Sequence, residues 1–366
     1  MSAITCSSEH KGEDPRSSAA KVEAKAAPSA ISSGTTNANL VRRNKRSFED
    51  VRIFEYTSAA NPDLKLVPVF AHPAELHKSG PSRVIHFDLS EQQGLPNVAT
   101  SPNLLASFIR ICEGESVETT AVATSQAFYV IRGEGKSVTA GSEDLEWEQG
   151  DLFVIPSNLG AAGKALVHSA TKDAALYWVN DEPLLKYLGV APVTERFNIT
   201  HFTNQVMLSE VERISHEPGA EHRNRLGILL GNSTTEDSTK TLTHTLWSLL
   251  NVLPAQSQQR PHRHNSVALD LCVSASIPAE GHGEGGRSPV YTLMGPELDE
   301  DGWVKDPVRC DWITGAVFTT PQGWWHSHHN ESDEPAWVLP MQDAGLLTHQ
   351  RVLDIRFAPP LKKQSP

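Results

Sequence analysis

The chain has 366 residues, of which 39% are hydrophobic, and this is enough for two globular domains with appended segments. Its formal net charge of −12 argues against nucleic acid or an anionic membrane as a partner, because both need clustered Lys and Arg. No run approaches the roughly eighteen consecutive apolar residues of a membrane span. The four cysteines show no paired spacing, which indicates a reducing compartment and favours the cytoplasm.

Residues 1–47 form a leader rich in Ser, Ala and Thr and poor in aromatic side chains, and this composition predicts disorder. An organelle transit peptide is the alternative for the leader. Four acidic residues, Glu9, Glu13, Asp14 and Glu23, weigh against it, because transit peptides are poor in acids.

Residues 48–190 predict a first β domain. Runs of β-branched and aromatic residues, separated by Gly and Pro, indicate strands. These runs are Leu66–Phe70, Leu105–Ile111, Ala127–Ile131 and Asp151–Ile155. Residues 191–240 are expected to connect this domain to the next through one short helix, Thr203–Ile214, because four apolar residues recur near helical spacing: Val206, Met207, Val211 and Ile214.

Residues 241–358 predict a second β domain, followed by a tail at 359–366, and this domain carries the chemistry. In the sequence His262-Arg-His264 the two imidazoles project from one face of a strand, with Cα atoms about 6.6 Å apart. The segment from Ala316 to Thr320 predicts another strand, which Pro321 and Gly323 end in a tight turn before a short strand presents His326. We therefore expect three histidines to converge on one metal ion.

These segments resemble the two motifs of the cupin superfamily. The second motif, G(x)5PxG(x)2H(x)3N, is matched at every fixed position, by Gly315, Pro321, Gly323, His326 and Asn330. The first motif, G(x)5HxH(x)3-4E(x)6G, keeps its histidines but lacks the opening Gly, has Ala268 at the Glu position and has Ala275 at the closing Gly. This departure is similar to that of gentisate 1,2-dioxygenases and related ring-cleaving bicupins.

The first domain also resembles a cupin barrel, through Gly114, Gly133, Gly150 and Pro156. Its metal-ligand positions are filled by other residues, namely Thr120, Val122, Gln126 and Ala161. The resemblance therefore implies an all-β fold of two cupin barrels in tandem, joined by a short helix, of which the first has lost its metal.

For the second barrel, the resemblance implies Fe(II) held by His262, His264 and His326. Three neutral ligands leave about three coordination positions for a small anionic substrate and O2. The spacing alone is equally compatible with zinc, manganese or nickel.

Two further residues are candidate catalytic groups. Asp270 shares the parity of the histidine pair, so it either approaches the metal or, in the role we favour, supports a ligand histidine. His328 shares the parity of His326, and it either contacts a ligand histidine, carries a proton or is merely exposed. His329 has the opposite parity and is expected at the surface.

The substrate-binding candidates are arginines and tryptophans. Arg260 and Arg287 offer planar guanidinium groups suited to a carboxylate, whereas Arg263 is expected to face outward from between the two histidines. Trp324 and Trp325 either line the pocket of the substrate ring or seal the mouth of the barrel.

The leading hypothesis is an Fe(II)-dependent dioxygenase that cleaves a small hydroxylated aromatic acid. The alternatives are other metal-cupin chemistry, as in a thiol dioxygenase, lyase or isomerase, and a non-catalytic bicupin that binds a metal or ligand. A homo-oligomer is expected, because open edges of antiparallel sheets need covering.

Overall fold

The computed structural model describes residues 50–60, 63–139, 144–157, 165–220, 223, 225–235, 239–275 and 287–359. The predictions for the leader 1–47 and for the tail beyond Pro359 lie outside these residues. The segment that ends at Leu64 is a unit of its own, whose described element is the 3₁₀ helix η3 (Tyr56–Ala60). The second unit, which starts at Lys65, contains the β structure.

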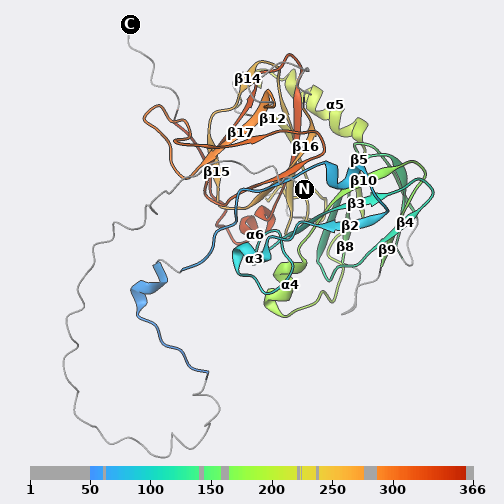
Figure 1. Cartoon of the computed structure of the whole chain (residues 1–366), viewed down its shortest axis with the longest axis horizontal. Coiled ribbons are helices and arrows are strands. Elements are labelled where there is room, and N and C mark those ends of the chain that lie inside the picture. The colour runs from blue at the N-terminus through green and yellow to red at the C-terminus, as the bar shows by residue number, and fades with distance from the viewer. Residues whose placement is uncertain are drawn as a thin grey trace, which may run out of the picture. The chain divides into compact units, whose positions relative to one another are not determined.

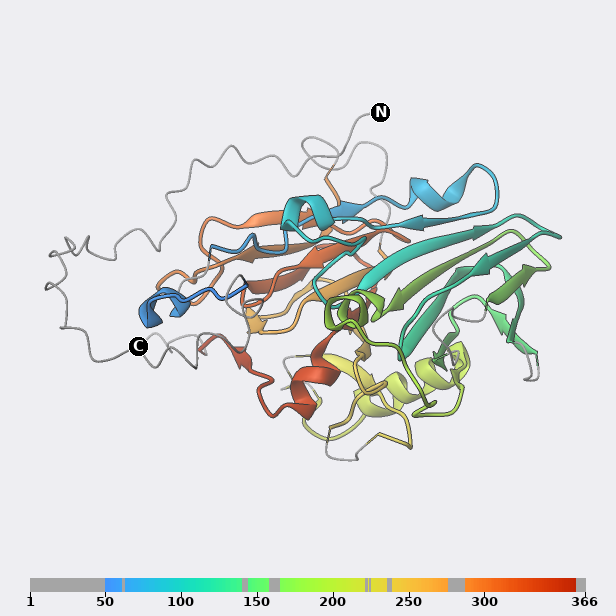
Figure 2. The same cartoon turned by 90° about the horizontal axis from the view of Figure 1, so that it is seen from below.

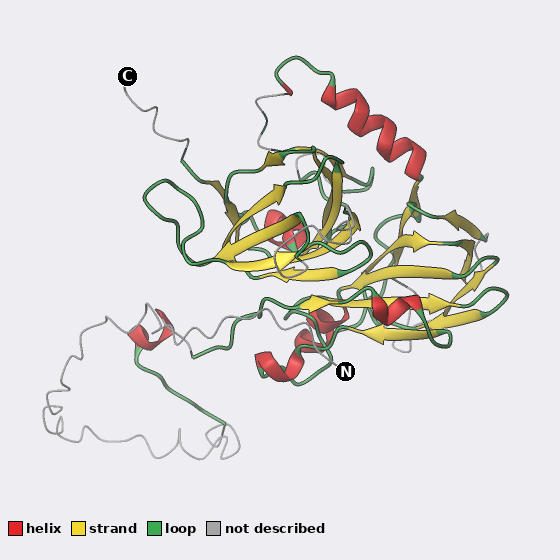
Figure 3. Ribbon diagram, turned by 45° about the horizontal axis from the view of Figure 1, so that its top comes forward, coloured by secondary structure: helices red, strands yellow, loops and turns green. Residues whose placement is uncertain are grey.

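Two antiparallel barrels make up this second unit, as predicted, and in the described part of the chain each is built from two sheets (Figures 1 and 3). In the first barrel the strand orders are β11-β8-β5-β10-β3-β2 and β4-β9-β6-β7. Its strands are β2 (Arg83–His86), β3 (Leu105–Ile111), β4 (Ser116–Thr119), β5 (Ser125–Arg132), β6 (Glu134–Thr139), β7 (Leu145–Glu148), β8 (Leu152–Pro156), β9 (Leu166–Ala170), β10 (Ala174–Asn180) and β11 (Thr200–Phe202).

In the second barrel the strand orders are β1-β19-β16-β21-β13-β12 and β18-β17-β20-β15-β22, with β14 also paired to β20. Its strands are β1 (Ala71–His72), β12 (Leu226–Leu230), β13 (Trp247–Leu253), β14 (Ser257–Gln258), β15 (His262–His264), β16 (Ala268–Ser274), β17 (Val290–Gly295), β18 (Val308–Asp311), β19 (Val317–Thr320), β20 (Trp325–Asn330), β21 (Ala336–Gln342) and β22 (Ile355–Phe357). The α-helices are α2 (Glu75–Lys78), α3 (Ser90–Gln93), α4 (Glu182–Leu188), α5 (Asn204–Ser215) and α6 (Ala344–His349). Within the described ranges, no helix has the length and apolar character that crossing a bilayer requires.

The buried, β-branched and aromatic runs form strands where the sequence predicts them. The predicted strand Leu105–Ile111 is β3, and every one of its residues is buried. The prediction is wrong at Leu66–Phe70, where the chain becomes a strand only at β1, and then as the edge of the other barrel's sheet. A two-residue edge strand has too few residues to show the alternation on which sequence prediction depends.

The two barrels exchange their first strands. β1 precedes the first barrel in the chain but pairs with β19 of the second, whereas β11 follows the first barrel and pairs with its β8. Each of these strands is followed by a helix, α2 or α5, and then by an edge strand, β2 or β12, so the chain consists of two similar repeats. The segment 191–240 thus contributes β11, α5 and β12 to the barrels.

Helix α5 confirms the predicted connecting helix. Thr203 caps it, and its hydroxyl group accepts a hydrogen bond from the backbone N–H of Val206. Met207 and Val211 are buried as expected, but Val206 is 55% exposed, so it does not share their face as predicted. In Figure 2, α5 lies on the side of the molecule away from β2.

In each barrel, a glycine that lies shortly before a strand packs against the other repeat. These glycines are Gly150, before β8, and Gly315, before β19. Gly150 and Gly315 have φ angles of +91° and +81°, in the region that favours glycine. A Cβ atom on Gly150 would overlap the side chain of Asn204 in α5, and one on Gly315 would lie 3.1 Å from Nε2 of His77 in α2. Both glycines therefore allow a close approach between the repeats.

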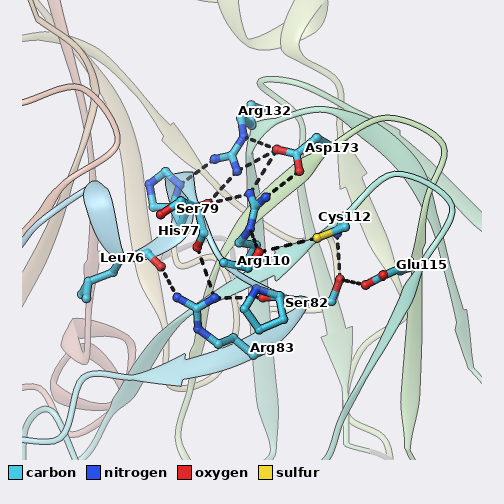
Figure 4. A network of polar contacts seen from close by, with 12 residues as sticks. Leu76, His77, Ser79, Ser82, Arg83, Arg110, Cys112, Glu115, Arg132 and Asp173 are labelled. Carbon is cyan, nitrogen blue, oxygen red and sulfur yellow. Dashed lines mark hydrogen bonds and ion pairs between the residues drawn. The ribbon is translucent and has the colours of Figure 1, made fainter.

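His77 links the two barrels through a network of arginines (Figure 4). Arg132 of β5 donates to Nδ1 of His77 over 2.6 Å, so Nε2 carries the proton and donates to the carbonyl oxygen of Gly315 over 3.0 Å. Arg132 and Arg110 share the carboxylate of Asp173 and donate to the carbonyl oxygen of His77. Helix α2, which carries His77, is therefore held on the first barrel while it contacts the second.

The interiors of the barrels differ. The first is filled by an apolar cluster that includes Phe128, Phe153 and Trp178. In the second, the apolar cluster contains Trp312 and Phe318 but not the strand β15, whose histidines face the interior. A third apolar cluster lies between the two barrels. It joins Phe108 and Tyr177, on β3 and β10 of the first barrel, to Leu250 and Leu339, on β13 and β21 of the second.

Candidate metal centre

Three histidines of the second barrel converge, as the spacing predicts. His262 and His264 lie on β15, and His326 lies directly opposite His262 on the antiparallel neighbour β20. One ring nitrogen from each lies within 4.8 Å of the corresponding nitrogens of the other two. All three residues are at most 4% exposed. This arrangement can hold one metal ion through three nitrogen donors.

Backbone carbonyl groups orient two of these rings. Nδ1 of His264 donates to the carbonyl oxygen of Ser266 over 2.9 Å, and Nδ1 of His326 donates to that of Trp324 over 3.0 Å. Each bond leaves the Nε2 lone pair free for a metal. Burial lowers the pKa of His264 to about 4, and burial lowers those of His262 and His326 as well, so the rings are neutral at neutral pH, as metal ligands must be.

The glycines of the second motif shape this part of the barrel. Gly323 has a φ of +75° in the turn between β19 and β20, and its N–H donates to the carbonyl oxygen of His264 over 2.7 Å. The turn therefore ties the strand that carries His326 to the strand that carries the other two histidines. Asn330 closes the far end of β20, where its side-chain N–H groups donate to the carbonyl oxygens of Leu253, Pro254 and Glu334.

Asp270 lies buried on β16, outside the group of three metal-competent histidines. Its carboxylate accepts a hydrogen bond from the Thr320 hydroxyl group over 2.7 Å, whereas the favoured expectation was a bond to a ligand histidine. Burial raises its pKa to about 6, although the hydrogen bond from Thr320 and the charge of Arg225 act in the opposite direction.

Arg225 is the principal site residue that sequence reasoning missed. It precedes β12, and its Nη2 donates to Nε2 of His262 and, over 3.1 Å, to Nε2 of His328. Burial of the guanidinium group lowers its pKa to about 10, which leaves the group charged at neutral pH. Its Nε is buried and has no hydrogen-bond partner among the described residues. Arg225 comes directly before the apolar run Leu226–Leu230, which indicates a strand. No local pattern, however, assigns that strand to the second barrel.

Asn251 is a second polar group that the sequence analysis overlooked. It interrupts the apolar strand β13, where Leu250 and Val252 face the core between the barrels, so alternation turns Asn251 into the second barrel. It is fully buried, and neither atom of its amide has a hydrogen-bond partner among the described residues. Its strand neighbour is Gly227 of β12, two residues after Arg225. A buried unpaired amide is costly unless a ligand satisfies it.

The two arginines chosen from sequence do not join this group in the described structure. Arg260 donates to the carbonyl oxygens of Asp301 and Pro359, and it stacks over the ring of Trp303 at 4.7 Å. Arg287 is exposed in the loop before β17. Arg263 lies over the ring of Trp325 at 5.0 Å.

The two tryptophans have different surroundings. Trp324 is partly buried and packs against the apolar cluster inside the second barrel, whereas Trp325 packs with Arg263. Only Trp324 therefore contacts the interior of the barrel.

The two histidines after His326 are both buried. Nδ1 of His328 lies 2.8 Å from the Thr292 hydroxyl group, and Nε2 of His328 meets Arg225. The expectation that His329 is a surface residue is wrong: it is 8% exposed, and it stacks on Tyr291 with ring centroids 4.8 Å apart. Its opposite parity directs it away from the triad, but the aromatic layer of Tyr291 and Trp303 covers it there.

The first barrel has other residues where the second has its ligands. Thr119 of β4 pairs with Leu166 of β9 as His262 pairs with His326. Thr119 therefore takes the place of the first ligand, one residue before the predicted Thr120, while Ala161 lies outside the described residues. Neither Thr119 nor Leu166 offers an imidazole.

The chain folds as two cupin-type barrels in tandem, and the histidine triad lies in the second. No family model and no curated protein matches the sequence. Among solved structures, the fold is similar to that of salicylate 1,2-dioxygenase from Pseudaminobacter salicylatoxidans, with a TM-score of 0.61 and 14% identity over 88% of this chain and 99% of the other. A variant of that enzyme in complex with gentisate gives a TM-score of 0.61 and 15% identity over 90% of this chain and 97% of the other.

Proposed function

We propose that this protein is an Fe(II)-dependent dioxygenase that uses O2 to cleave a small hydroxylated aromatic acid of the gentisate type. The observation that carries the proposal is the buried triad of His262, His264 and His326 with the charged guanidinium group of Arg225 beside it. Three neutral donors and an adjacent cation suit a site that receives an anion. The salicylate dioxygenase with the same fold supports this choice of chemistry.

The donor set fits iron. Imidazole nitrogen is a common ligand of iron, and the carbonyl partners of His264 and His326 hold two rings with Nε2 available. When bound, iron would supply the redox chemistry by which O2 is activated for ring cleavage.

The protein side chains would bind and orient the substrate. Arg225 would pair with the carboxylate of the aromatic acid, because its fork of N–H groups matches two oxygens and its Nε has no other partner. The unpaired amide of Asn251 would hydrogen-bond to a ring substituent, and Trp324 would contact the ring. The apolar cluster behind the site would exclude water.

His328 would accept a proton-bearing group of the substrate, and Asp270 would balance charge. Arg225 donates to Nε2 of His328, so that nitrogen carries a lone pair, which would accept a hydrogen bond from a substrate hydroxyl group once Arg225 turns to the substrate carboxylate. Asp270 would balance the charge of Arg225, since each shifts the pKa of the other. We place the reaction in the cytoplasm, because the spacing of the cysteines in the sequence indicates a reducing compartment.

Metal analysis and product analysis test the proposal. The purified chain is loaded anaerobically with Fe(II), its metal content is measured, and O2 consumption and ultraviolet spectra are followed with a panel of hydroxylated benzoates. The expected result is about one iron per chain and oxygen-dependent ring opening. The variant His264→Ala should lose both iron and activity, while His216→Ala, an exposed histidine at the end of α5, should keep them.

Three results would contradict the proposal in different ways. A chain that binds no transition metal would be a non-catalytic bicupin. Turnover without O2 would indicate a lyase or isomerase, and oxidation of a thiol but of no benzoate would indicate a thiol dioxygenase. Circular dichroism of each variant separates loss of the metal site from loss of the fold.

A further inference from the structure

A chain of hydrogen bonds runs behind His328 to the wall of the second barrel. The indole N–H of Trp312 donates to the Thr292 hydroxyl oxygen over 2.8 Å, and that oxygen lies 2.8 Å from Nδ1 of His328. Thr292 on β17 is the direct strand partner of His328 on β20. Thr292 is fully buried, and Trp312 and His328 are at most 2% exposed.

The direction of these bonds follows from Arg225. A guanidinium group only donates hydrogen bonds, so Nε2 of His328 is the acceptor in its contact with Arg225. A neutral imidazole carries one proton, which must then lie on Nδ1 and point to the Thr292 oxygen. The Thr292 oxygen uses its two lone pairs for Trp312 and His328.

The first barrel contains the same chain of residues in the same register. Trp147 donates to the Ser137 hydroxyl oxygen over 2.9 Å, and that oxygen lies 2.7 Å from Nδ1 of His168. Ser137 and His168 are direct partners on β6 and β9, as Thr292 and His328 are on β17 and β20. In this barrel Nε2 of the histidine meets the hydroxyl group of Thr119 instead of an arginine.

The comparison separates what the barrel requires from what the site requires. A tryptophan, a hydroxyl residue and a histidine occur in both barrels, including the one without the histidine triad. Only in the second barrel does the far nitrogen of the histidine face Arg225 and the triad. In the second barrel, the hydroxyl residue and the tryptophan are thus placed where they can orient a histidine that faces the metal site.

We propose that Thr292 and Trp312 are positioning residues, which keep His328 in its Nδ1–H form when Arg225 turns to the carboxylate of an anionic hydroxy-aromatic ligand, so that the released Nε2 lone pair accepts from the hydroxyl group of that ligand. The ligand class rests on the proposed function, whereas the tautomer does not. The site would then select acids that carry a hydroxyl donor next to the carboxylate that Arg225 binds.

Zinc-loaded protein permits a test without turnover, because zinc is diamagnetic. The ring nitrogens of ¹⁵N-labelled histidine report the tautomer by NMR, and His328→Gln identifies the signals of His328. Wild-type protein should show a protonated Nδ1 and an unprotonated Nε2. Thr292→Val should mix the two tautomers, whereas Thr292→Ser, which restores the hydroxyl group, should return the wild-type signals.

Salicylate binding to the same zinc-loaded samples is the second measurement. Loss of the support from Thr292 should weaken binding about 2- to 13-fold, the range for one neutral hydrogen bond. Ser137→Ala, the equivalent change in the first barrel, is the matched control and should leave salicylate affinity unchanged. If Thr292→Val does not fold, Trp312→Phe keeps the aromatic packing, loses the N–H and should shift the His328 signals in the same direction by less.

Two results would overturn the proposal. One is an unchanged His328 tautomer in Thr292→Val and Trp312→Phe. The other is an equal loss of salicylate affinity in Ser137→Ala and Thr292→Val, which would mean a general effect on packing. If wild-type protein binds zinc but no hydroxybenzoate, the proposed function and the ligand class fail, and the NMR signals still decide the role of Thr292.

Discussion

Replacement of Arg225 by methionine should change metal affinity and anion affinity in opposite directions. The Arg225 guanidinium group donates to Nε2 of His262, whose lone pair a metal also needs. A metal ion must therefore displace this hydrogen bond and bind close to a fixed positive charge. Methionine keeps much of the side-chain volume and removes both obstacles, but it also removes the partner of an anionic substrate.

The hydrogen bond of Arg225 sets the expected magnitude of both effects. A hydrogen bond that involves a charged group contributes about 1.5–3 kcal/mol, which corresponds to about 13- to 160-fold in an equilibrium constant. Arg225→Met should therefore bind zinc more tightly by a factor in this range and bind salicylate more weakly by a similar factor. Arg225→Lys keeps the charge and loses the planar fork, so it should lose part of the salicylate affinity.

Competition with a chromophoric chelator measures zinc affinity, and calorimetry of the zinc-loaded protein measures salicylate affinity. Arg260→Met is the matched control, because Arg260 binds the carbonyl oxygens of Asp301 and Pro359 and should leave both constants unchanged. A parallel fall of both affinities in Arg225→Met, or no change in either, would refute the assigned role.

Two further predictions concern the contact between the repeats. Gly315→Ala should lower the free energy of unfolding by about 1–3 kcal/mol, because alanine disfavours a φ of +81° and its Cβ would lie 3.1 Å from Nε2 of His77. Gly94→Ala, at a φ of +66° with no neighbour within 4 Å, should carry the backbone cost alone, and equal losses in urea unfolding would contradict the contact. Burial lowers the pKa of His77 to about 4, so its neutral form stabilises the fold above the unfolded-state pKa of about 6.5, and this contribution should be lost as the pH falls from 6.5 to 4. Unfolding free energies over this pH range should fall less steeply for His77→Gln than for wild type, and identical slopes would show that His77 does not titrate in this way.

Local patterns in the sequence were sufficient for the triad and for much of the β structure. Alternation along a strand places His262 and His264 on one face, and the Pro and Gly of the second motif return the chain at His326. The same alternation turns Asp270 inward and Arg263 away from its two histidine neighbours, where it stacks on Trp325. Each of these inferences needs only residues that are close in the chain.

The tertiary structure decided which distant groups meet the triad. Arg225 meets the triad from the position just before β12, which joins the second barrel by pairing with β13, and no local pattern specifies that pairing. The burial of His329 likewise depends on Tyr291 from a neighbouring strand. The exchange of β1 and β11 between the barrels has the same cause. Strands of two or three residues carry too little pattern to predict their partner, so the sheet that they join is decided by the tertiary structure. The sequence by itself therefore determined the metal-binding side chains and their parity, while long-range strand pairing determined the charge and the hydrogen-bond partners around them.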